Sequence, residues 1–500
     1  MTVRSFCRVF RWAGLAAVAP FLWACNARSL ERPTLKPDST FGKTFQQTIN
    51  RNVDMLFLVD DSSSMGLSQD NLRRNFPVFM QRLMEPPGLP NIHVAVVSSD
   101  MGAGDGSVSE CDATGGQGGI FRYTPTTPPP DEPTCMVNLN PGEHFITNIG
   151  GQANYTGSLE DTFSCMAALW EGGCGYEHQF AAILRALGAD GRPAPQENQG
   201  FLRPDAYLVI VLITNEDDCS AAPGVPLFDV WSNPNIASQL GPPSNFRCNE
   251  FGHLCDDGSG NAVHPNRSAP GNDAAATVTY QSCRSNDQEG YLLGVVDTAN
   301  RIKALKADPS QVMVASIQGP PTPYTVTWKT NADTSCGAAS CPWPVIGHSC
   351  QAADGSFADP GIRTGELVNQ FGANGLLLPI CAGDFGPSLD RIATLINTTL
   401  QPPCITQRVA NKAGTQDPEC TVVSHTSDGL GGFVDAAVPY CGANGNAAPC
   451  WTLTPGGTSC TGGRIVDVSS APNLPPSTAQ NATVNCALCD PNVPDPARCP

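Results

Sequence analysis

A short polar segment that could bind a metal ion follows an apolar run near the start of the sequence. Residues 53–60 read VDMLFLVD and lead into DSSSMG. Asp60, Ser62 and Ser64 therefore supply one carboxylate and two hydroxyls at alternate positions. Mg2+ prefers octahedral sets of oxygen ligands, with few carboxylates and some retained waters. The pattern predicts a divalent-cation site, and a serine-rich turn that caps a helix is the structural alternative.

Two later segments supply further candidate ligands. The acidic sequence NEDD follows the strand-like run that ends at Thr214, which makes Asn215 and Asp217 candidates, and the acids beside Asp217 could take the same role. Glu177 closes the sequence GGCGYE and precedes a segment with helical spacing of apolar residues. It is either a ligand or a side chain stabilised by the helix dipole.

Alternating strand-like and helix-like segments must position these residues. Continuous apolar runs are typical of parallel strands buried on both faces, and they occur at 53–60, 92–98, 207–214, 311–317 and 375–380. Helical spacing recurs between them, at 68–83 with Ser68 as a cap and Pro77 as a kink, and at 177–187, 291–306, 365–371 and 388–400. This alternation predicts an α/β fold with a doubly wound, mainly parallel sheet. Ligands bind such sheets at the carboxyl ends of the strands, where Asp60 lies.

Long Gly-, Pro- and Cys-rich stretches interrupt this pattern at 102–156, 220–288 and 319–360. We interpret them as irregular insertions stapled by disulfides. After residue 403 the sequence changes to short β-like runs punctuated by cysteines, which predicts a small Cys-rich β domain over 403–500. The α/β domain with its insertions is expected to occupy 50–402.

The segments VDMLFLVDDSSSMG, GCGYE and NEDDCS together resemble a known family. Asp60, Ser62 and Ser64 fit the DxSxS motif of the metal-ion-dependent adhesion site (MIDAS) of von Willebrand factor A (vWA) domains, and the resemblance covers about residues 50–400. It implies a bound Mg2+, or Mn2+ or Ca2+, and a partner that presents a carboxylate. Family members complete the site with a Thr and an Asp from two other loops. Here Asn215 stands in place of that Asp, and no Thr precedes Glu177, so Glu177, Asp217 or the Asn215 amide oxygen would have to compensate.

The N-terminus is typical of an exported protein. Arg4, Arg8 and Arg11 precede an apolar stretch at 13–23 that is too short to span a bilayer, and the sequence LWAC ends at Cys25. This resembles a bacterial lipobox, and the whole pattern resembles Cys-rich vWA lipoproteins of Gram-negative bacteria. It implies a signal peptide over 1–24, acylation of Cys25 and a tether over 25–49. Ordinary secretion, with Cys25 as a disulfide partner, is the alternative.

The cysteine count agrees with export. Of 22 cysteines, Cys7 lies in the expected signal peptide and Cys25 is the expected lipid site, which leaves 20 for disulfides. Local spacing suggests the pairs 111/135, 165/174, 248/255 and 441/450. Cys486 and Cys489 form a CxxC sequence, and structural disulfides are a better interpretation of it than a redox or zinc pair.

Charge and the absence of catalytic motifs narrow the function. A formal net charge of −18 disfavours binding to nucleic acids. The sequence contains no HExxH, GxSxG or P-loop motif, and its seven histidines are scattered, so we do not expect an enzyme. The predicted function is metal-dependent adhesion to a protein or matrix partner from the bacterial envelope. The alternative is a structural envelope lipoprotein with a degenerate metal site.

Overall fold

The computed structural model describes most of the chain after residue 43. The described residues are 44–499 without 86–87, 104–110, 112–114, 125–134, 136, 229–238, 241–245, 274, 332–340, 401–403, 428–432, 444, 446, 448, 457–459, 470–479 and 491–494. The predicted signal peptide, Cys25 and most of the predicted tether lie outside this range.

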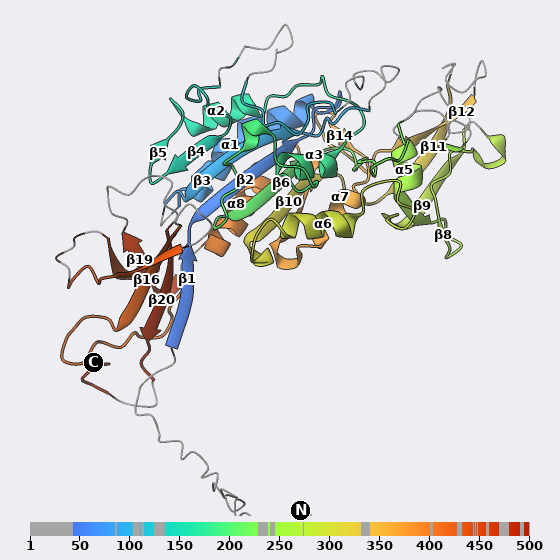
Figure 1. Cartoon of the computed structure of the whole chain (residues 1–500). Helices are drawn as coiled ribbons and strands as arrows, with labels where there is room; N and C mark the ends of the chain where they lie inside the picture. Colours follow the sequence, from blue (N-terminus) through green and yellow to red (C-terminus); the bar gives the residue numbers. More distant parts are fainter. Residues whose placement is uncertain are drawn as a thin grey trace, which may run out of the picture.

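A seven-stranded, mainly parallel sheet forms the centre of the molecule (Figure 1). Its strand order is β15-β10-β6-β2-β3-β4-β5, and of these strands only β4 runs in the opposite direction, pairing antiparallel with both β3 and β5. The strands are β2 (Asn52–Val59), β3 (Asn91–Ser98), β4 (Ile146–Ile149), β5 (Gln152–Ala153), β6 (Tyr207–Ile213), β10 (Val312–Gln318) and β15 (Gly375–Pro379). The chain places β3 on one side of β2 and β6 on the other, so the strand order reverses at β2. The prediction of a mixed α/β fold with a mainly parallel sheet is confirmed.

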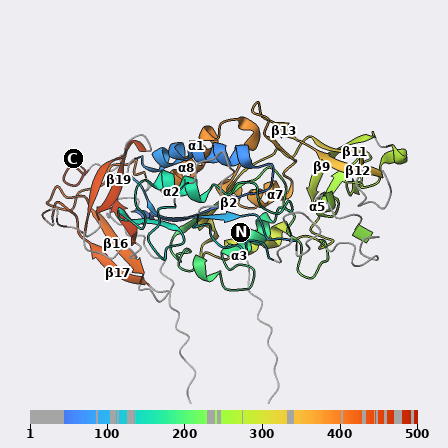
Figure 2. The ribbon, with the colours of Figure 1, turned by 90° about the horizontal axis from the view of Figure 1, so that it is seen from above.

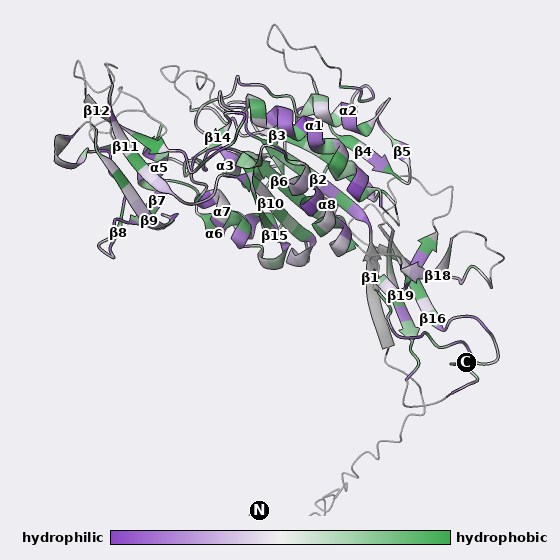
Figure 3. Cartoon of the chain, turned by 180° about the vertical axis from the view of Figure 1, so that it is seen from behind, coloured by the Kyte–Doolittle hydropathy of each residue, from purple (hydrophilic) through white to green (hydrophobic). Residues whose placement is uncertain are grey.

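Helices cover both faces of this sheet, and Figure 2 shows α1 and α8 on one side of β2 and α3 on the other. One core cluster joins Phe57 of β2 to Phe76, Phe79 and Phe163, which come from helices on the first face. Leu56 and its alternate neighbours pack in a second cluster on the other face. The helices are α1 (Gly66–Leu83), α2 (Leu159–Met166) and α8 (Gly386–Leu400) on the first face, and α3 (Gln179–Ala186), α6 (Val295–Lys303) and α7 (Arg363–Asn369) on the second. Because both faces are covered, these strands are mostly apolar on both faces, as the colours of β6 and β10 show in Figure 3.

Helix α1 differs from the expectation at its start. It begins at Gly66 with Met65 as the N-cap residue, so Ser68 lies inside the first turn and is not the cap. Glu171 Oε1 instead accepts from the backbone N–H of Gly66 at 3.1 Å, while Gln69 Nε2 ties the helix start to the carbonyl oxygens of Asp60 and Trp170. Pro77 lies inside the helix, which continues past it to Leu83.

The stretches interpreted as irregular insertions contain a second sheet, and that interpretation was wrong in this respect. The strands β7 (His253–Asp256), β8 (Ala262–Val263), β9 (Thr277–Ser285), β11 (Tyr324–Asn331) and β12 (Cys341–Gly347) form a five-stranded antiparallel sheet. We call it the insertion sheet; it projects from one end of the central sheet (Figure 1). Trp328 and Tyr324 are buried in its own core, together with residues of α5 (Phe246–Gly252). The Thr, Val, Tyr and Trp residues of β9 and β11 suit half-buried strands.

A third group of strands lies at the opposite end of the central sheet (Figure 1). It consists of a four-stranded sheet, β1-β20-β16-β17, and the hairpin β18-β19, and it has a core around Trp451. The strands are β1 (Thr44–Asn50), β16 (Cys420–Ser427), β17 (Phe433–Val438), β18 (Cys450–Gly456), β19 (Cys460–Ser469) and β20 (Gln480–Ala487). Strand β1, the end of the predicted tether, pairs antiparallel with β20, so residues 44–50 belong to this sheet.

Eighteen cysteines of the described part of the chain are paired, as predicted, but mostly with other partners than local spacing suggested. The disulfides are 111–174, 135–165, 219–248, 255–283, 350–381, 404–460, 420–486, 441–450 and 489–499. Of the four suggested pairs only Cys441–Cys450 is correct, because the fold brings together loops that are distant in the sequence. Cys486 and Cys489 each pair elsewhere, with Cys420 and Cys499, so the CxxC sequence contributes to two structural disulfides.

None of the helices in the described part of the chain combines the length and the apolar character needed to cross a bilayer.

Candidate functional site

Asp60 lies at the carboxyl end of β2, at the point where the strand order reverses. Its side chain is completely buried. Oδ1 accepts a hydrogen bond from the backbone N–H of Ser62 at 2.9 Å, and Oδ2 accepts one from Thr214 Oγ1 at 2.7 Å. Thr214 follows β6, so this bond ties together the ends of two neighbouring strands. The carboxylate is thereby held in one orientation at the edge of the sheet.

The two predicted serines lie beside Asp60 and reach Asn215. Ser62 Oγ and Ser64 Oγ are 3.4 Å apart. Asn215 Nδ2 donates to Ser64 Oγ at 2.9 Å and to the carbonyl oxygen of Phe357 at 3.2 Å. The side chain of Asn215 is only 1% exposed. The structure therefore brings Asp60, Ser62, Ser64 and Asn215 together.

Glu177 is the second carboxylate at this place. It is 1% exposed and lies in the loop before α3. Oε2 accepts a hydrogen bond from Ser99 Oγ at 2.7 Å, whereas Oε1 is a buried oxygen with no hydrogen-bond partner. Two residues further on, Gln179 Nε2 donates to Thr214 Oγ1 at 2.9 Å, which links this loop to the partner of Asp60.

Burial and mutual repulsion govern the protonation of the two carboxyls. Burial raises the pKa of Asp60. Burial and then the neighbouring charges of Asp60 and Glu216 raise the pKa of Glu177 well above its ordinary value. Two buried carboxylates that repel one another are stabilised by a cation between them. The electrostatics of this site therefore favour a bound positive ion.

Asp217 has a structural role that occupies both of its oxygens. Its Oδ2 accepts from the backbone N–H groups of Ile362 and Arg363, at 2.9 and 2.8 Å, and lies 2.8 Å from His253 Nε2, while Oδ1 accepts from the backbone N–H of Thr364 at 3.0 Å. Burial alone would raise the pKa of Asp217, but these hydrogen bonds lower it below the ordinary value. The structure thus places this predicted ligand at the start of α7, not among the oxygen atoms around Asp60.

Asp61 and Asp100, which flank the site, are also engaged. Asp61 accepts from Ser98 Oγ at 2.7 Å and from Gln117 Nε2 at 2.6 Å, and burial raises its pKa to about 7. Asp100 Oδ1 accepts from the backbone N–H of Gly102 at 2.8 Å. These carboxyls fix the loops around the site.

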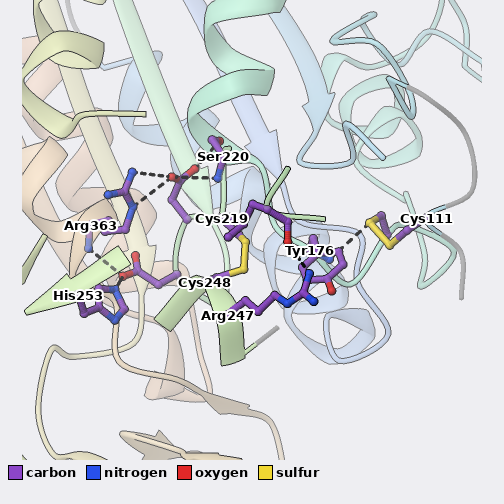
Figure 4. Close-up of a disulfide and its surroundings, with 12 residues drawn as sticks. Cys111, Tyr176, Cys219, Ser220, Arg247, Cys248, His253 and Arg363 are labelled. Atoms are coloured by element: carbon purple, nitrogen blue, oxygen red, sulfur yellow. Dashed lines mark hydrogen bonds and ion pairs between the residues drawn. A yellow bond between two sulfur atoms is a disulfide. The ribbon is translucent and has the colours of Figure 1, made fainter. Parts of the chain in front are cut away.

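Disulfides and close backbone packing hold the loops that carry Glu177 and Asn215. Cys219 follows the Asn215 loop and pairs with Cys248 of α5 (Figure 4). Cys174, three residues before Glu177, pairs with Cys111. A Cβ at Gly173 would lie 2.3 Å from Asp61 Oδ1, so only glycine lets this loop approach so closely.

The donor set fits a hard divalent cation. The oxygen atoms brought together come from Asp60, Ser62, Ser64 and Glu177, and Mg2+ and Mn2+ prefer such ligands. The unpartnered Glu177 Oε1 is the observation that tests this fit, because a buried carboxylate oxygen without a donor calls for a cation. Within the described residues, no group of three or more His, Cys, Asp or Glu side chains could hold a metal ion. A site here would thus depend on the hydroxyls as well as on two carboxylates.

Sequence reasoning missed two residues of the site. Thr214 anchors Asp60, and Ser99 anchors Glu177. A signal for both was present, because each follows a continuous apolar strand, and the carboxyl ends of parallel strands meet at one edge.

Comparisons with known proteins do not identify a family for this chain. No protein-family model matches it, and no curated protein matches it either. Among solved structures it is similar to the pilus adhesin SpaC from Lactobacillus rhamnosus GG, with 13% identity and a TM-score of 0.28 over 89% of this chain and 41% of that chain. The pilus adhesin RrgA from Streptococcus pneumoniae gives 11% identity and a TM-score of 0.27 over 90% and 58%. The human COPII-coat protein Sec24c gives 7% and 0.26 over 89% and 47%. The chain spans less than two thirds of each of these proteins, and similarity at this level assigns no function.

Proposed function

We propose that the chain is an envelope-anchored binding protein whose α/β part is a doubly wound vWA-type domain with a divalent-metal adhesion site. One observation carries this proposal: at the end of the sheet where the strand order reverses, the buried Glu177 carboxyl lies close enough to Asp60 for the charge of Asp60 to raise its pKa, and Ser64 lines the same cavity as Glu177. Ligands of open α/β sheets bind in the crevice at such a point.

The ion would be Mg2+, or Mn2+ or Ca2+. Asp60, Ser62 and Ser64 would hold it, with Glu177 as the second carboxylate in place of the Asp that Asn215 replaces. When bound, the ion supplies an open coordination position for the carboxylate of a protein or matrix partner. Thr214 and Ser99 orient the two carboxylates by hydrogen bonds that leave the remaining lone pairs for the ion.

Binding rather than catalysis is proposed because the sequence contains none of the common hydrolase or nucleotide-binding motifs. The acylation of Cys25, which would attach the protein to the outer membrane or cell surface of a Gram-negative bacterium, remains a prediction from the sequence. The alternative function is a structural envelope lipoprotein whose metal site is degenerate.

Titration calorimetry with MgCl2 separates these two functions. The wild type is expected to bind Mg2+. Asp60→Ala should abolish this binding while the protein stays folded, because it removes the carboxylate that the hydrogen bonds from Ser62 and Thr214 hold at the site. Asp257→Ala is the matched control, since it removes an exposed carboxylate from an acidic turn in the insertion sheet. If Asp60→Ala binds Mg2+ as well as the wild type, or the wild type binds none with or without a carboxylate ligand, the scaffold function is correct.

A further inference from the structure

A cavity of about 300 Å³ lies beside the candidate metal site, between the edge of the central sheet and the insertion sheet. Ser64, Glu177 and Glu216 line its polar end. Val345 of β12 and Phe357 line its apolar walls, and Phe246, Pro344 and Ile346 add to them. Two separate sheets thus contribute to one cavity, one with oxygen atoms and the other with carbon.

Most acids in the cavity wall are already matched by a donor. Asp218 forms an ion pair with Arg363 at 3.1 Å, and Asp359 Oδ1 lies 2.8 Å from His348 Nδ1. Asp217 is bound by His253 and by the start of α7. Glu177 Oε1, in contrast, has no partner. The buried carboxyl oxygen without a hydrogen-bond partner therefore lies at the polar end, which Ser64 also lines and where the proposed ion would bind.

The size of the cavity restricts what can enter it. About 300 Å³ is the lower end of the range for small-ligand sites, so the flat surface of a folded partner cannot fill it. A group that projects into the cavity can, with its carboxylate at the polar end and its side chain between Val345 and Phe357. The rigid walls add to this selection, since the Cys219–Cys248 disulfide joins the site loop to α5 beside the cavity (Figure 4).

We propose that this cavity selects a carboxylate that carries an adjacent apolar side chain, and that Val345 and Phe357 determine this preference. The inference rests on the proposed metal site, because the ion must offset the charge of Glu177 before a carboxylate can bind. Two sources share this chemistry: the C-terminal residue of a polypeptide and a free N-acylated amino acid.

Calorimetry at saturating Mg2+ tests the preference with defined probes. Acetyl-Ala-Ala-Leu with a free carboxylate should bind, its C-terminal amide should not, and acetyl-Ala-Ala-Ser should bind about tenfold or more weakly, as the loss of a buried leucine side chain predicts. Acetyl-leucine tests the second source: equal binding of acetyl-leucine and the tripeptide indicates a free acid, and tighter binding of the tripeptide indicates a chain end.

Variants in the apolar wall connect the preference to the cavity. Val345→Thr should weaken the discrimination between the leucine and serine peptides and leave Mg2+ binding unchanged, because it makes the wall more polar without adding a charge near the ion; Val345→Ala is the substitute if the first variant does not fold. Val296→Thr is the matched control, because Val296 is an apolar side chain of α6 that is 52% exposed. It should change neither property.

The outcomes separate this inference from the proposed function. If Mg2+ binds but the amide binds as well as the acid, or leucine and serine peptides bind equally, the selectivity is overturned and the metal site stands. If Mg2+ does not bind but leucine-selective binding of the free carboxylate persists, the metal site and the role of the ion in carboxylate binding are both overturned, and only the apolar preference of the cavity stands. Failure of both the ion and every probe to bind overturns both.

Discussion

Glu177 and Asn215 together decide how much negative charge the candidate site carries. Asn215 is neutral, and its amide nitrogen donates to Ser64 Oγ and to the carbonyl oxygen of Phe357. Glu177 is buried, and its Oε1 has no hydrogen-bond partner. In the proposed site the two carboxylates are therefore Asp60 and Glu177, which come from different loops.

This arrangement predicts that substitutions at Glu177 and Asn215 change the affinity for Mg2+ to very different extents. Glu177→Gln should weaken Mg2+ binding strongly, because it removes one of two carboxylates from an ion site. Asn215→Asp should change the affinity much less, since a third buried carboxylate adds repulsion as well as attraction. Calorimetry on both variants measures this directly. A large gain from Asn215→Asp together with no loss from Glu177→Gln would show that Glu177 is not a ligand and that the site lacks compensation.

A buried histidine outside the site predicts a pH dependence of stability. His93 is buried, its Nδ1 lies 2.7 Å from the carbonyl oxygen of Phe201, and burial lowers its pKa to about 4. An unfolded histidine has a pKa near 6.5. Between these values the unfolded chain binds the extra proton, so the free energy of unfolding falls as the pH falls from about 6.5 to about 4, by about 3 kcal/mol.

Urea unfolding of the wild type and His93→Gln across this pH range measures that contribution. The variant should be less stable at pH 7 but show a smaller loss towards pH 4. Burial also lowers the pKa of His178 to about 4, so the variant still loses some stability as the pH falls. Asp61, whose pKa is raised to about 7, instead adds stability as the pH falls. The contribution of His93 is therefore the difference between the pH profiles of the wild type and the variant. Parallel pH profiles would contradict the assignment to His93.

Site residues that are close together in the sequence could be predicted, and those whose role depends on distant parts of the chain could not. Asp60, Ser62 and Ser64 are close in sequence, so their spacing alone places them together. Asp217 and Glu177 could not be separated as candidates, because each is an acid in a loop, one after a strand-like run and the other before a helix-like segment. The difference between them depends on backbone N–H groups at 362–364 that bind Asp217, and these come from a distant part of the chain.

Strands that are continuous apolar runs could be predicted from the sequence, whereas strands that alternate polar and apolar residues could not. Strands β2, β6 and β10 are buried on both faces and therefore read as continuous apolar runs. Strands β9 and β11 alternate polar and apolar residues within Gly- and Pro-rich surroundings. Their pairing joins segments on either side of α6 and β10, which no local pattern reveals. The disulfide partners were obscured for the same reason.

The disulfide between Cys219 and Cys248 should affect the site as well as stability. Replacing both cysteines with alanine opens a loop of 29 residues and should lower the free energy of unfolding by about 3 kcal/mol. Because Cys219 follows Asp218 in the loop that carries Asn215, the change should also weaken binding of Mg2+.

Replacing Cys489 and Cys499 with alanine gives the matched control. This disulfide closes a loop of 10 residues next to the C-terminal strands, which lie at the end of the central sheet opposite the insertion sheet (Figure 1). Its loss should lower stability by a similar amount and leave Mg2+ binding unchanged. Urea unfolding and calorimetry on both double variants measure the two effects separately. Equal effects on metal binding would mean that the Cys219–Cys248 disulfide does not position the site.

For the molecule as a whole, the N-terminal strand and the candidate site lie at opposite ends of β2. Strand β1 ends at Asn50 and β2 begins at Asn52, so the chain passes from the C-terminal sheet directly into the central sheet (Figure 1). The eight residues of β2 then carry it about 26 Å further, to Asp60. A chain that continues from a lipid anchor at Cys25 would therefore enter the described fold through β1, at the end of β2 remote from Asp60.

This separation predicts that anchoring and metal binding are independent. Expressed in a Gram-negative host, the wild type should partition with membranes and carry an acylated N-terminal cysteine, whereas Cys25→Ser should be soluble or remain uncleaved. Cys7→Ser is the matched control, because Cys7 lies in the predicted signal peptide and should not affect partitioning. Purified Cys25→Ser should bind Mg2+ as the wild type does, since Cys25 precedes β1 and the site follows β2. Membrane fractionation, mass spectrometry of the N-terminal peptide and calorimetry test the three statements, and an unlipidated N-terminal peptide in the wild type would refute the anchor without affecting the proposed metal site.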